Sequence, residues 1–278
     1  MLRTVALLGL ASGAPPLPSK RGVGGAASLT QAGDLAALAG VAWFYDWSLE
    51  PPAPYANDSY AQEFVPMVWG ADATDDLASF EPRATSTALL GFNEPNLRSQ
   101  ANLTAAEACA AWPTLTAFAA ASGLRLGSPA VDYCTPSGSG QQDSNCWQGH
   151  YDWLDEFFGN CSLDTVDFIT THKYGCNATA TLEYVTELRA KYGKPVWLTE
   201  FSCSEAGADA QLSFQQEILP TFDSLPADVL ERYAWFATRT DQSDSSPQKN
   251  AALMYNTSAR NLTALGVYYN STEEARRS

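Results

Sequence analysis

The strongest constraint on the fold of this chain is a regular alternation, from about residue 22 onward, of short β-type runs with longer helical stretches. The runs are 22–26, 40–46, 64–69, 88–93, 124–129, 166–174, 195–201 and 232–238. Strands that alternate with helices pair in parallel, because each helix returns the chain to the same end of the sheet. Eight parallel strands close a barrel, so the pattern predicts an α/β protein with a single (β/α)8 TIM barrel.

Helical character between the runs supports this prediction. An Ala-rich segment follows Thr104, whose hydroxyl is expected to cap a helix at its N-terminus. Region 251–268 predicts a short hairpin that leads into a closing helix. The other expected helices are 29–39, 104–122, 179–192 and 209–223.

The length of 278 residues suits one large domain, expected over residues 22–270 and followed by a flexible tail at 271–278. No apolar run approaches the length that spans a bilayer, so no membrane contact is expected. Residues 133–149 are rich in Ser, Gly and Gln and predict a long loop bracketed by Cys134 and Cys146. This loop either shapes part of a site at the barrel mouth or is a tolerated surface insertion.

Three features indicate a secreted protein. Residues 1–14 combine Arg3 with a short apolar stretch and small residues, as a signal peptide does. The Lys20–Arg21 pair is either a processing site, which would remove residues up to 21, or an ordinary basic pair. Seven Asn-X-Ser/Thr sequons predict N-glycosylation. Six cysteines without metal-binding spacing favour disulfides, whose pairing the sequence leaves open.

Charge and motifs narrow the function. A formal net charge of −15 argues against nucleic acid as a partner and favours a neutral substrate or an acidic working pH. The sequence contains no phosphate-binding loop, nucleotide fingerprint or metal-ligand cluster, so neither a cofactor nor a metal is expected. We expect a monomer.

Two glutamates stand where β-type runs end. Glu94 lies in GFNEPN (91–96), at the end of the fourth run, and Glu200 lies in VWLTEF (196–201), at the end of the seventh. The C-terminal ends of barrel strands form the mouth that carries the active site. Both carboxylates are therefore expected at the mouth.

Strand alternation is expected to turn both glutamates into the barrel. Val196 and Leu198 share a side of their strand with the glutamate that follows, and Leu90 and Phe92 do the same on the fourth run. Each glutamate would then end an inward-facing apolar column. Two carboxylates that face each other suit cleavage of a glycosidic bond. One protonates the leaving oxygen, and the other attacks the anomeric carbon or activates water.

Sequence blocks around these residues resemble a known family. The Asn-Glu-Pro and Thr-Glu-Phe strand ends are similar to those of clan A glycoside hydrolases. Seven blocks in order, covering about residues 20–270, resemble glycoside hydrolase family 128, a family of β-1,3-glucanases. The blocks are VAWFYDW (41–47), FVPMVWG (64–70), LLGFNEPN (89–96), LGSPAV (126–131), VDFITTHKYG (166–175), PVWLTEFSC (195–203) and LTALGVYY (262–269).

The resemblance implies an endo-acting β-1,3-glucanase that hydrolyses β-1,3-glucan with retention, by double displacement. Glu94 matches the acid/base and Glu200 the nucleophile. Asn93 is placed to donate a hydrogen bond to the 2-hydroxyl of the sugar. His172 is expected to bind the substrate or a catalytic carboxylate. Aromatic strand ends are expected to stack on sugar rings, although they would equally cap the barrel core; they are Trp43, Tyr45, Trp47, Trp69, Tyr174, Phe201 and Trp235.

One departure and two alternatives remain open. The first strand, RGVGGAA (21–27), contains only small residues after Arg21 where larger ones would contribute to the cleft, so an altered subsite is expected there. A related clan A hydrolase that acts on another β-glucan or on mannan would keep the same two glutamates. A catalytically weak β-glucan-binding barrel is the other alternative, although it would not need both carboxylates.

Overall fold

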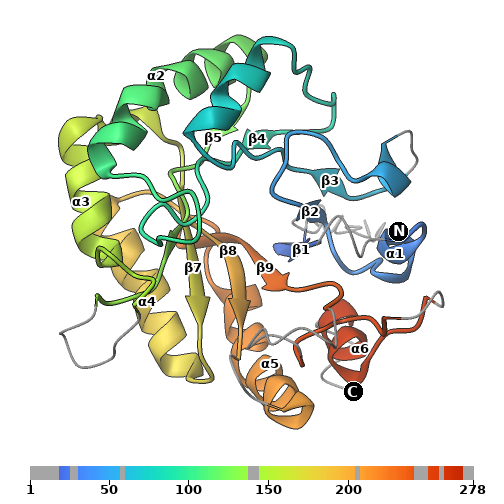
Figure 1. Cartoon of the computed structure of the whole chain (residues 1–278). Coiled ribbons are helices and arrows are strands. Elements are labelled where there is room, and N and C mark those ends of the chain that lie inside the picture. The colour runs from blue at the N-terminus through green and yellow to red at the C-terminus, as the bar shows by residue number, and fades with distance from the viewer. Residues whose placement is uncertain are drawn as a thin grey trace, which may run out of the picture.

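The computed structural model describes residues 19–25, 31–56, 60–136, 144–203, 207–240, 250–256 and 260–271. The expected signal peptide (1–14) and residues 272–278 of the expected tail lie outside this part of the chain. Parallel strands occupy the centre of the molecule, and the long helices surround them (Figure 1).

The strands pair in parallel around a ring. One sheet has the order β3-β2-β1-β9-β8-β7-β6, and β4 and β5 form a second ladder. Single parallel bridges, Met67–Leu90 and Gly127–Phe168, connect this ladder to the segments on either side, and β6 continues the segment that β5 begins. The strands are β1 (Arg21–Gly24), β2 (Trp43–Tyr45), β3 (Glu63–Phe64), β4 (Ala88–Leu89), β5 (Arg125–Leu126), β6 (Val131–Asp132), β7 (Ile169–Tyr174), β8 (Val196–Ser202) and β9 (Leu230–Phe236).

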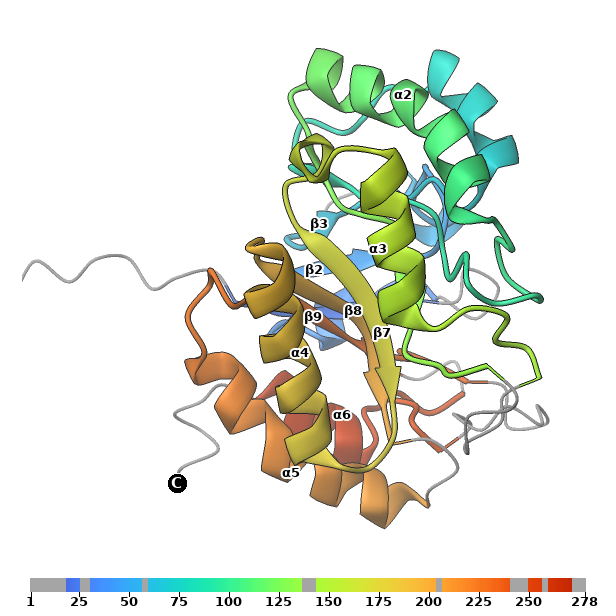
Figure 2. The ribbon, with the colours of Figure 1, turned by 90° about the vertical axis from the view of Figure 1, so that its left-hand side faces the viewer.

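The helices follow one another around the outside of this ring, as Figure 2 shows for α3 and α4 beside β7. Thr104 caps α2 through a reciprocal pair of hydrogen bonds with Glu107, which confirms the expected helix start. The elements are α1 (Asp34–Ala37), α2 (Ala105–Ser122), α3 (His150–Asn160), α4 (Ala178–Tyr192), α5 (Ala208–Ser224) and α6 (Ala264–Asn270), with 3-10 turns η1 (Ala53–Tyr55), η2 (Ala71–Ala78) and η3 (Leu163–Thr165).

The apolar core has two layers. An outer layer joins strands to helices, and an inner layer draws only on strands and the residues that extend them. Phe168 and Trp197 stack inside the ring with their centroids 4.0 Å apart. A barrel of this size is filled by side chains in this way and has no open channel. The inner layer consists of Trp43, Tyr45, Val65, Met67, Ala88, Leu90, Ala130, Phe168, Trp197 and Ala234.

The small residues of β1 have a packing reason. A Cβ on Gly22 would lie 2.2 Å from the ring of Trp43, and a Cβ on Gly24 would lie 3.4 Å from the ring of Trp47. The two tryptophans of the neighbouring strand segment therefore fill the space that the side chains of β1 leave.

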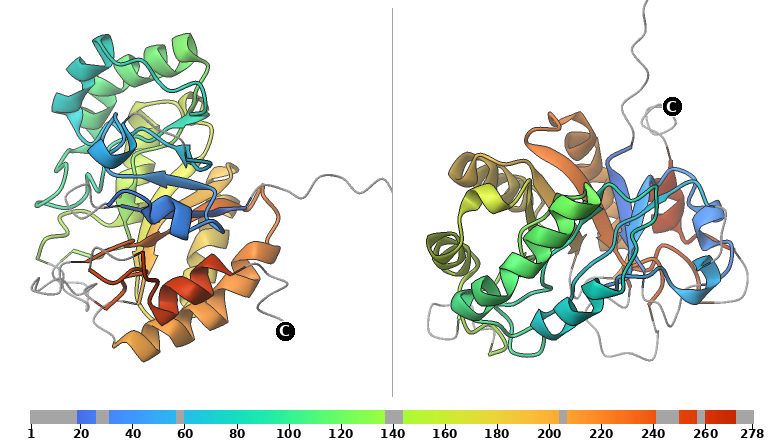
Figure 3. Two further views of the ribbon diagram at one scale, coloured as in Figure 1. Left: turned by 90° about the vertical axis from the view of Figure 1, so that its right-hand side faces the viewer. Right: turned by 90° about the horizontal axis from the view of Figure 1, so that it is seen from above.

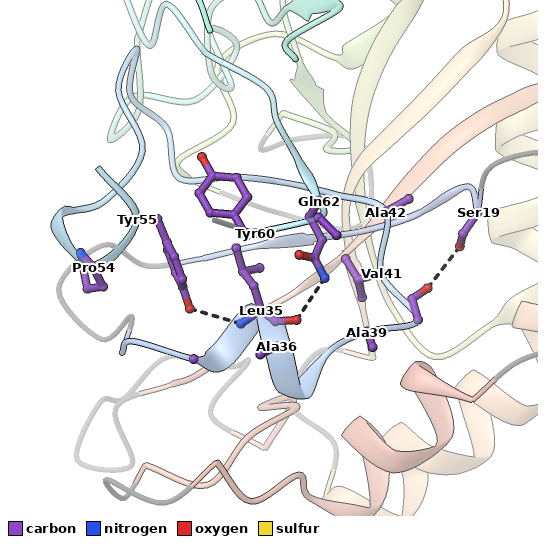
Figure 4. A pocket seen from close by; sticks show the side chains of 13 residues that line it. Ser19, Leu35, Ala36, Ala39, Val41, Ala42, Pro54, Tyr55, Tyr60 and Gln62 are labelled. Atoms are coloured by element: carbon purple, nitrogen blue, oxygen red, sulfur yellow. Dashed lines mark hydrogen bonds between the residues drawn. The ribbon is translucent and has the colours of Figure 1, made fainter. Parts of the chain in front are cut away.

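The side of the barrel that β1, β2 and β3 form is covered by short elements (Figure 3, left). A cavity of about 750 Å3 lies there between α1 and the segments 54–55 and 60–62 (Figure 4). Leu35 and Tyr55 line it, and the amide of Gln62 donates a hydrogen bond to the carbonyl of Leu35 at 2.9 Å. None of the expected site residues, all of which the structure describes, lines this cavity.

Three disulfides pair all six cysteines: Cys109–Cys161, Cys134–Cys146 and Cys176–Cys203. The first ties α2 to the end of α3, and the second closes the loop that the sequence brackets. The third joins the segments that follow β7 and β8. In the described part of the chain, no helix has the length and apolarity needed to cross a membrane.

Candidate active site

Glu200 lies at the mouth and is surrounded by hydrogen-bond donors. Its Oε1 accepts from the hydroxyl of Tyr45 at 3.0 Å and from the indole of Trp47 at 2.9 Å. Its Oε2 accepts from the hydroxyl of Tyr174. Burial and the charge of Glu200 raise the pKa of both tyrosines well above the usual value, so both remain donors at any working pH.

Glu200 reaches the interior by a route that alternation does not predict. Val196 and Leu198 pack outward in the helix-facing layer, and Trp197 points into the barrel. The inward-facing column expected for this strand is therefore wrong. Leu198 pairs with Thr171 and Glu200 with His172, so Thr199 is an extra residue on β8. This bulge reverses the alternation and turns Glu200 inward.

Glu94 also departs from simple alternation. Leu90 belongs to the inner layer, whereas Phe92 packs on Trp112 of α2 in the outer layer, with ring centroids 5.6 Å apart. The second expected column is therefore wrong as well. Glu94 has a φ of 43°, in the left-handed region that non-glycine residues seldom adopt. Its side chain is 8% exposed and contacts His172.

His172 joins the two carboxylates. Its Nδ1 lies 2.7 Å from Glu94 Oε1, and its Nε2 lies 3.5 Å from Glu200 Oε1. Burial lowers the pKa of His172, but the charge of Glu200 and the contact with Glu94 outweigh burial and raise that pKa to about 9. The imidazole is therefore a cation at neutral pH. Its positive charge lies between the two carboxylates and offsets the repulsion between their negative charges.

The pKa of Glu200 reflects opposing influences. Burial raises this pKa most, and the charge of His172 opposes it. The like charge of Glu94 raises it further, whereas the hydrogen bonds from Tyr174 and Trp47 lower it. The net direction is upward, so the donors limit a shift that burial would otherwise make larger.

The structure brings only some of the expected aromatic residues to the glutamates. Tyr45, Trp47 and Tyr174 bond Glu200 directly, and Trp69 lies at the surface with 38% exposure. Trp43 is different: it is 1% exposed and belongs to the inner layer. Asn93 lies beside Glu94 and donates its side-chain N–H to Gln100 at 3.2 Å.

Phe201 and Trp235 lie away from the mouth. Both are fully buried in the outer layer and contact each other edge-to-face at 5.0 Å. The alternative that strand-end aromatics belong to the core therefore describes these two rings. The bulge that turns Glu200 inward places the next residue, Phe201, on the outer side.

Phe236 is a residue of the mouth that the sequence pattern did not indicate. Its ring contacts the rings of Trp47 at 5.6 Å and Tyr174 at 6.2 Å, and it follows Trp235 by one position. The register of β9 against β8 shifts between Val196 and Trp197, where β9 carries an extra residue. A one-residue shift exchanges the faces of a strand. The register of a partner strand cannot be read from a single run.

A groove lies beside Trp47, between the segments that follow β2 and β3 and η2. Its volume is about 460 Å3, within the range of ~300–1,000 Å3 that small-molecule sites occupy. Trp47 connects it to Glu200, Trp69 adds an exposed ring, and Asp76 of η2 contributes a carboxylate. The remaining lining residues are Ser48, Leu49, Glu50, Met67, Ala73, Ser79 and Phe80.

One group of three side chains in the described part of the chain has the proximity that a metal ion would need. Glu94, His172 and Glu200 each offer a ligand atom within 4.8 Å of the others. Two of them are the glutamates that the family resemblance matches to the acid/base and the nucleophile, and the third is the histidine that lies between them. The expectation of no metal stays a prediction.

A parallel barrel with facing carboxylates at its mouth defines the class of this protein. The family described as "Glycosyl hydrolase catalytic core" matches residues 25–269, and the chain belongs to it. Within that class, the chain is similar to a glycoside hydrolase family 128 (subgroup II) endo-β-1,3-glucanase from Sorangium cellulosum. That structure has 34% identity and a TM-score of 0.78, with 91% of this chain and 98% of that chain covered. The resemblance to family 128 and the expected barrel fold are thereby confirmed.

Two further relatives differ in what their names describe. A subgroup III curdlan-specific exo-β-1,3-glucanase from Blastomyces gilchristii has 30% identity and a TM-score of 0.68, covering 92% of this chain and 100% of that chain. "Alkali-sensitive linkage protein 1" of Schizosaccharomyces pombe is 31% identical over 241 residues, or 83% of this chain. This chain spans 40% of the length of that protein.

Proposed function

We propose that this chain is a secreted β-1,3-glucanase that cleaves β-1,3-glucan internally and with retention. The observation that carries the proposal is the pair Glu94 and Glu200, which face each other at the mouth with His172 between them. The β-1,3-glucanase names of the solved relatives support the choice of substrate. Three disulfides support an oxidising compartment.

The donors around each carboxylate support a division of roles. Glu200 receives hydrogen bonds from three side chains, which stabilise its charged form and aim it at an anomeric carbon. In the part of the chain that the structure describes, the imidazole of His172 is the only hydrogen-bond partner of the Glu94 side chain, so Glu94 can exchange a proton with a leaving oxygen. Glu200 is therefore the proposed nucleophile and Glu94 the proposed acid/base.

Double displacement follows from these roles. Glu200 attacks the anomeric carbon while Glu94 protonates the departing oxygen, and water activated by Glu94 then hydrolyses the glycosyl ester. Retaining enzymes hold their carboxyl groups ~5–5.5 Å apart, and inverting enzymes hold them ~6.5–9.5 Å apart. Each glutamate has an oxygen within 4.8 Å of an oxygen of the other, which is compatible with the shorter spacing of retaining enzymes.

The proposed binding surface is smaller than the sequence suggests. Trp47, Trp69, Tyr174 and Asn93 keep their proposed contacts with sugar, and Phe236 joins them because its ring lies against two of these residues. Tyr45 is completely buried and is proposed to act on Glu200 alone. The deeply buried rings of Trp43, Phe201 and Trp235 are not proposed to touch the substrate.

The first experiment follows product configuration. Purified protein is incubated with a linear β-1,3-glucan, and the anomer released first is identified by NMR while product lengths are measured. Initial β-anomers and a range of lengths are expected from a retaining, endo-acting enzyme. Initial α-anomers would contradict retention, and glucose alone from the start would contradict endo action. Turnover of β-1,6-glucan or mannan with no turnover of β-1,3-glucan would contradict the proposed substrate.

A further inference from the structure

The end of β8, just after Glu200, is held by a side chain from another element. Cys203 follows β8 and is fully buried. Gln211, in the first turn of α5, accepts a hydrogen bond from the backbone N–H of Cys203 at 2.9 Å and donates one to its carbonyl. One amide thus satisfies both backbone groups of a residue that has left the ladder, as a neighbouring strand would.

A covalent tie acts on the same residue. Cys203 forms a disulfide with Cys176, which lies two residues after Tyr174. The last backbone hydrogen bond between these two segments runs from Gly175 to Ser202 at 3.0 Å. The ends of β7 and β8 are therefore joined just beyond Tyr174 and Glu200, which are hydrogen-bonded to each other.

These ties lie just beyond the part of β8 where the pairing is irregular. The register between β8 and β9 shifts between Leu198 and Phe201, because the bulge that turns Glu200 inward interrupts regular pairing. A bulge leaves the extra residue unpaired and allows the strand to bend. The position of Glu200 thus depends on what holds the strand beyond the bulge.

We propose that Gln211 is a positioning residue for the nucleophile and that, with the Cys176–Cys203 disulfide, it fixes the end of β8 so that Glu200 meets Tyr174. The proposal rests on the proposed role of Glu200. Gln211 is completely buried and lies behind the mouth, so it acts through β8 and not on the sugar.

The chain offers a matched control one helical turn further along α5. Gln215 is also completely buried, but its side-chain amide has no hydrogen-bond partner among the described residues. Replacing either glutamine by Met keeps the length of the side chain and removes its amide. Only the replacement of Gln211 removes hydrogen bonds to the nucleophile strand. The Cys109–Cys161 disulfide is the equivalent control for Cys176–Cys203.

A purely structural role predicts a different result from a positioning role. The hydrogen bond from Tyr174 lowers the pKa of Glu200, so weakening that contact raises the pKa further. The acidic limb of the activity profile then moves to higher pH. A change that only destabilises the fold lowers the melting temperature and leaves the pH profile in place.

The test compares Gln211→Met with Gln215→Met, and Cys176→Ser/Cys203→Ser with Cys109→Ser/Cys161→Ser. Turnover of a β-1,3-gluco-oligosaccharide is measured across pH, together with melting temperature. The pKa of Glu200 is followed by carboxyl 13C NMR, with Glu200→Gln used to assign its signal. Gln211→Met is expected to lower kcat by at least about tenfold with little change in KM, and to raise the pKa of Glu200. Gln215→Met is expected to change neither.

Each outcome bears on the proposal. Equal effects of the two Met variants on kcat and on the pKa of Glu200 would overturn it, as would a lower melting temperature alone. If Gln211→Met does not fold, Gln211→Glu, which keeps the acceptor for the Cys203 N–H and loses the donor at neutral pH, takes its place. The NMR measurement of the pKa of Glu200 needs no substrate. Failure of the wild type to cleave β-1,3-glucan would therefore contradict the proposed function and leave the positioning test intact.

Discussion

Glu94 and Glu200 end equivalent strand segments at the same mouth, yet the protein holds them in different ways. Three donors from two strand segments converge on Glu200, whereas the side chain of Glu94 contacts one imidazole. Glu200 reaches its place through a β-bulge, and Glu94 through a left-handed backbone with a φ of 43°. The same outcome, a carboxylate that faces inward, thus arises from two unrelated departures from regular strand geometry.

The difference supports the opposite roles that are proposed for these two identical side chains. A carboxylate that receives several hydrogen bonds is stabilised in its charged form, as a nucleophile requires. A carboxylate with a single cationic neighbour can gain and lose a proton during the reaction. Residues in sparsely populated backbone regions cost of order 1–3 kcal/mol, so the surrounding barrel must stabilise the conformation of Glu94.

The largest expected effect separates the two carboxylates. Glu200→Gln is expected to lose about three or more orders of magnitude in kcat on every substrate, because it removes the proposed nucleophile. Glu94→Gln is expected to lose a similar factor on a β-1,3-oligosaccharide. It should lose far less on an aryl glycoside whose leaving group needs no proton. Rates on the two substrate types check this, and equal losses for both variants on the aryl glycoside would contradict the division of roles.

The next effect concerns His172, which links the two halves of the site. Its pKa is raised from 6.5 to about 9, so the folded state binds its proton more tightly than the unfolded state. The resulting stabilisation, on the order of 3 kcal/mol, is fully present below pH 6.5 and is lost as the pH rises through 9. Denaturant unfolding of the wild type and of His172→Asn should differ most near pH 6 and converge above pH 9.

His150 is the control for this prediction. Burial lowers the pKa of His150, so its proton is bound more weakly in the folded state. His150 contributes a loss of stability as the pH falls below the unfolded value, the opposite sign to His172. A His150→Asn variant that showed the same pH dependence as His172→Asn would sink the assignment of the effect to the bridge.

A smaller effect distinguishes the donors to Glu200. Tyr174→Phe removes a hydrogen bond to the charged Oε2, and such bonds contribute ~1.5–3 kcal/mol, or roughly 10–150-fold in rate if realised in the transition state. Tyr45→Phe is expected to cost less, because its hydroxyl is also 3.1 Å from the carbonyl of Thr199. Both variants should shift the acidic limb to higher pH. The kcat values across pH check the order, and a larger loss for Tyr45→Phe would reverse it.

Much of this arrangement could be predicted from the sequence. The eight runs, the cap at Thr104 and the location of both glutamates at strand ends depend on local patterns, which one chain contains in full. The disulfides were predicted as a class, although their pairing, such as that of Cys134 with Cys146, was left open. These features need no knowledge of which strands are neighbours.

What could not be predicted depends on register. The bulge at Thr199 and the extra residue on β9 arise from pairing with neighbouring strands, and they decide which side chains face inward. They place Phe236 at the mouth and Trp235 in the outer layer, where its indole donates to the carbonyl of Ala251 at 2.7 Å. A period of two is exact only in an uninterrupted strand, so the expectation failed where each strand was interrupted.

The smallest expected effect tests whether the substrate reaches from Glu200 into the groove that Trp47 lines. Trp69→Ala removes an exposed ring, and Asp76→Asn removes a charge that can accept hydrogen bonds from sugar hydroxyls. Each is expected to lower kcat/KM by about three- to tenfold on long β-1,3-oligosaccharides, since one stacking or polar contact contributes ~1 kcal/mol. Short oligosaccharides that do not reach the groove should be unaffected. Asp75→Asn is the matched control, because this neighbour in η2 does not line the groove. A loss that is equal for Asp75 and Asp76, or independent of chain length, would place the sugar elsewhere.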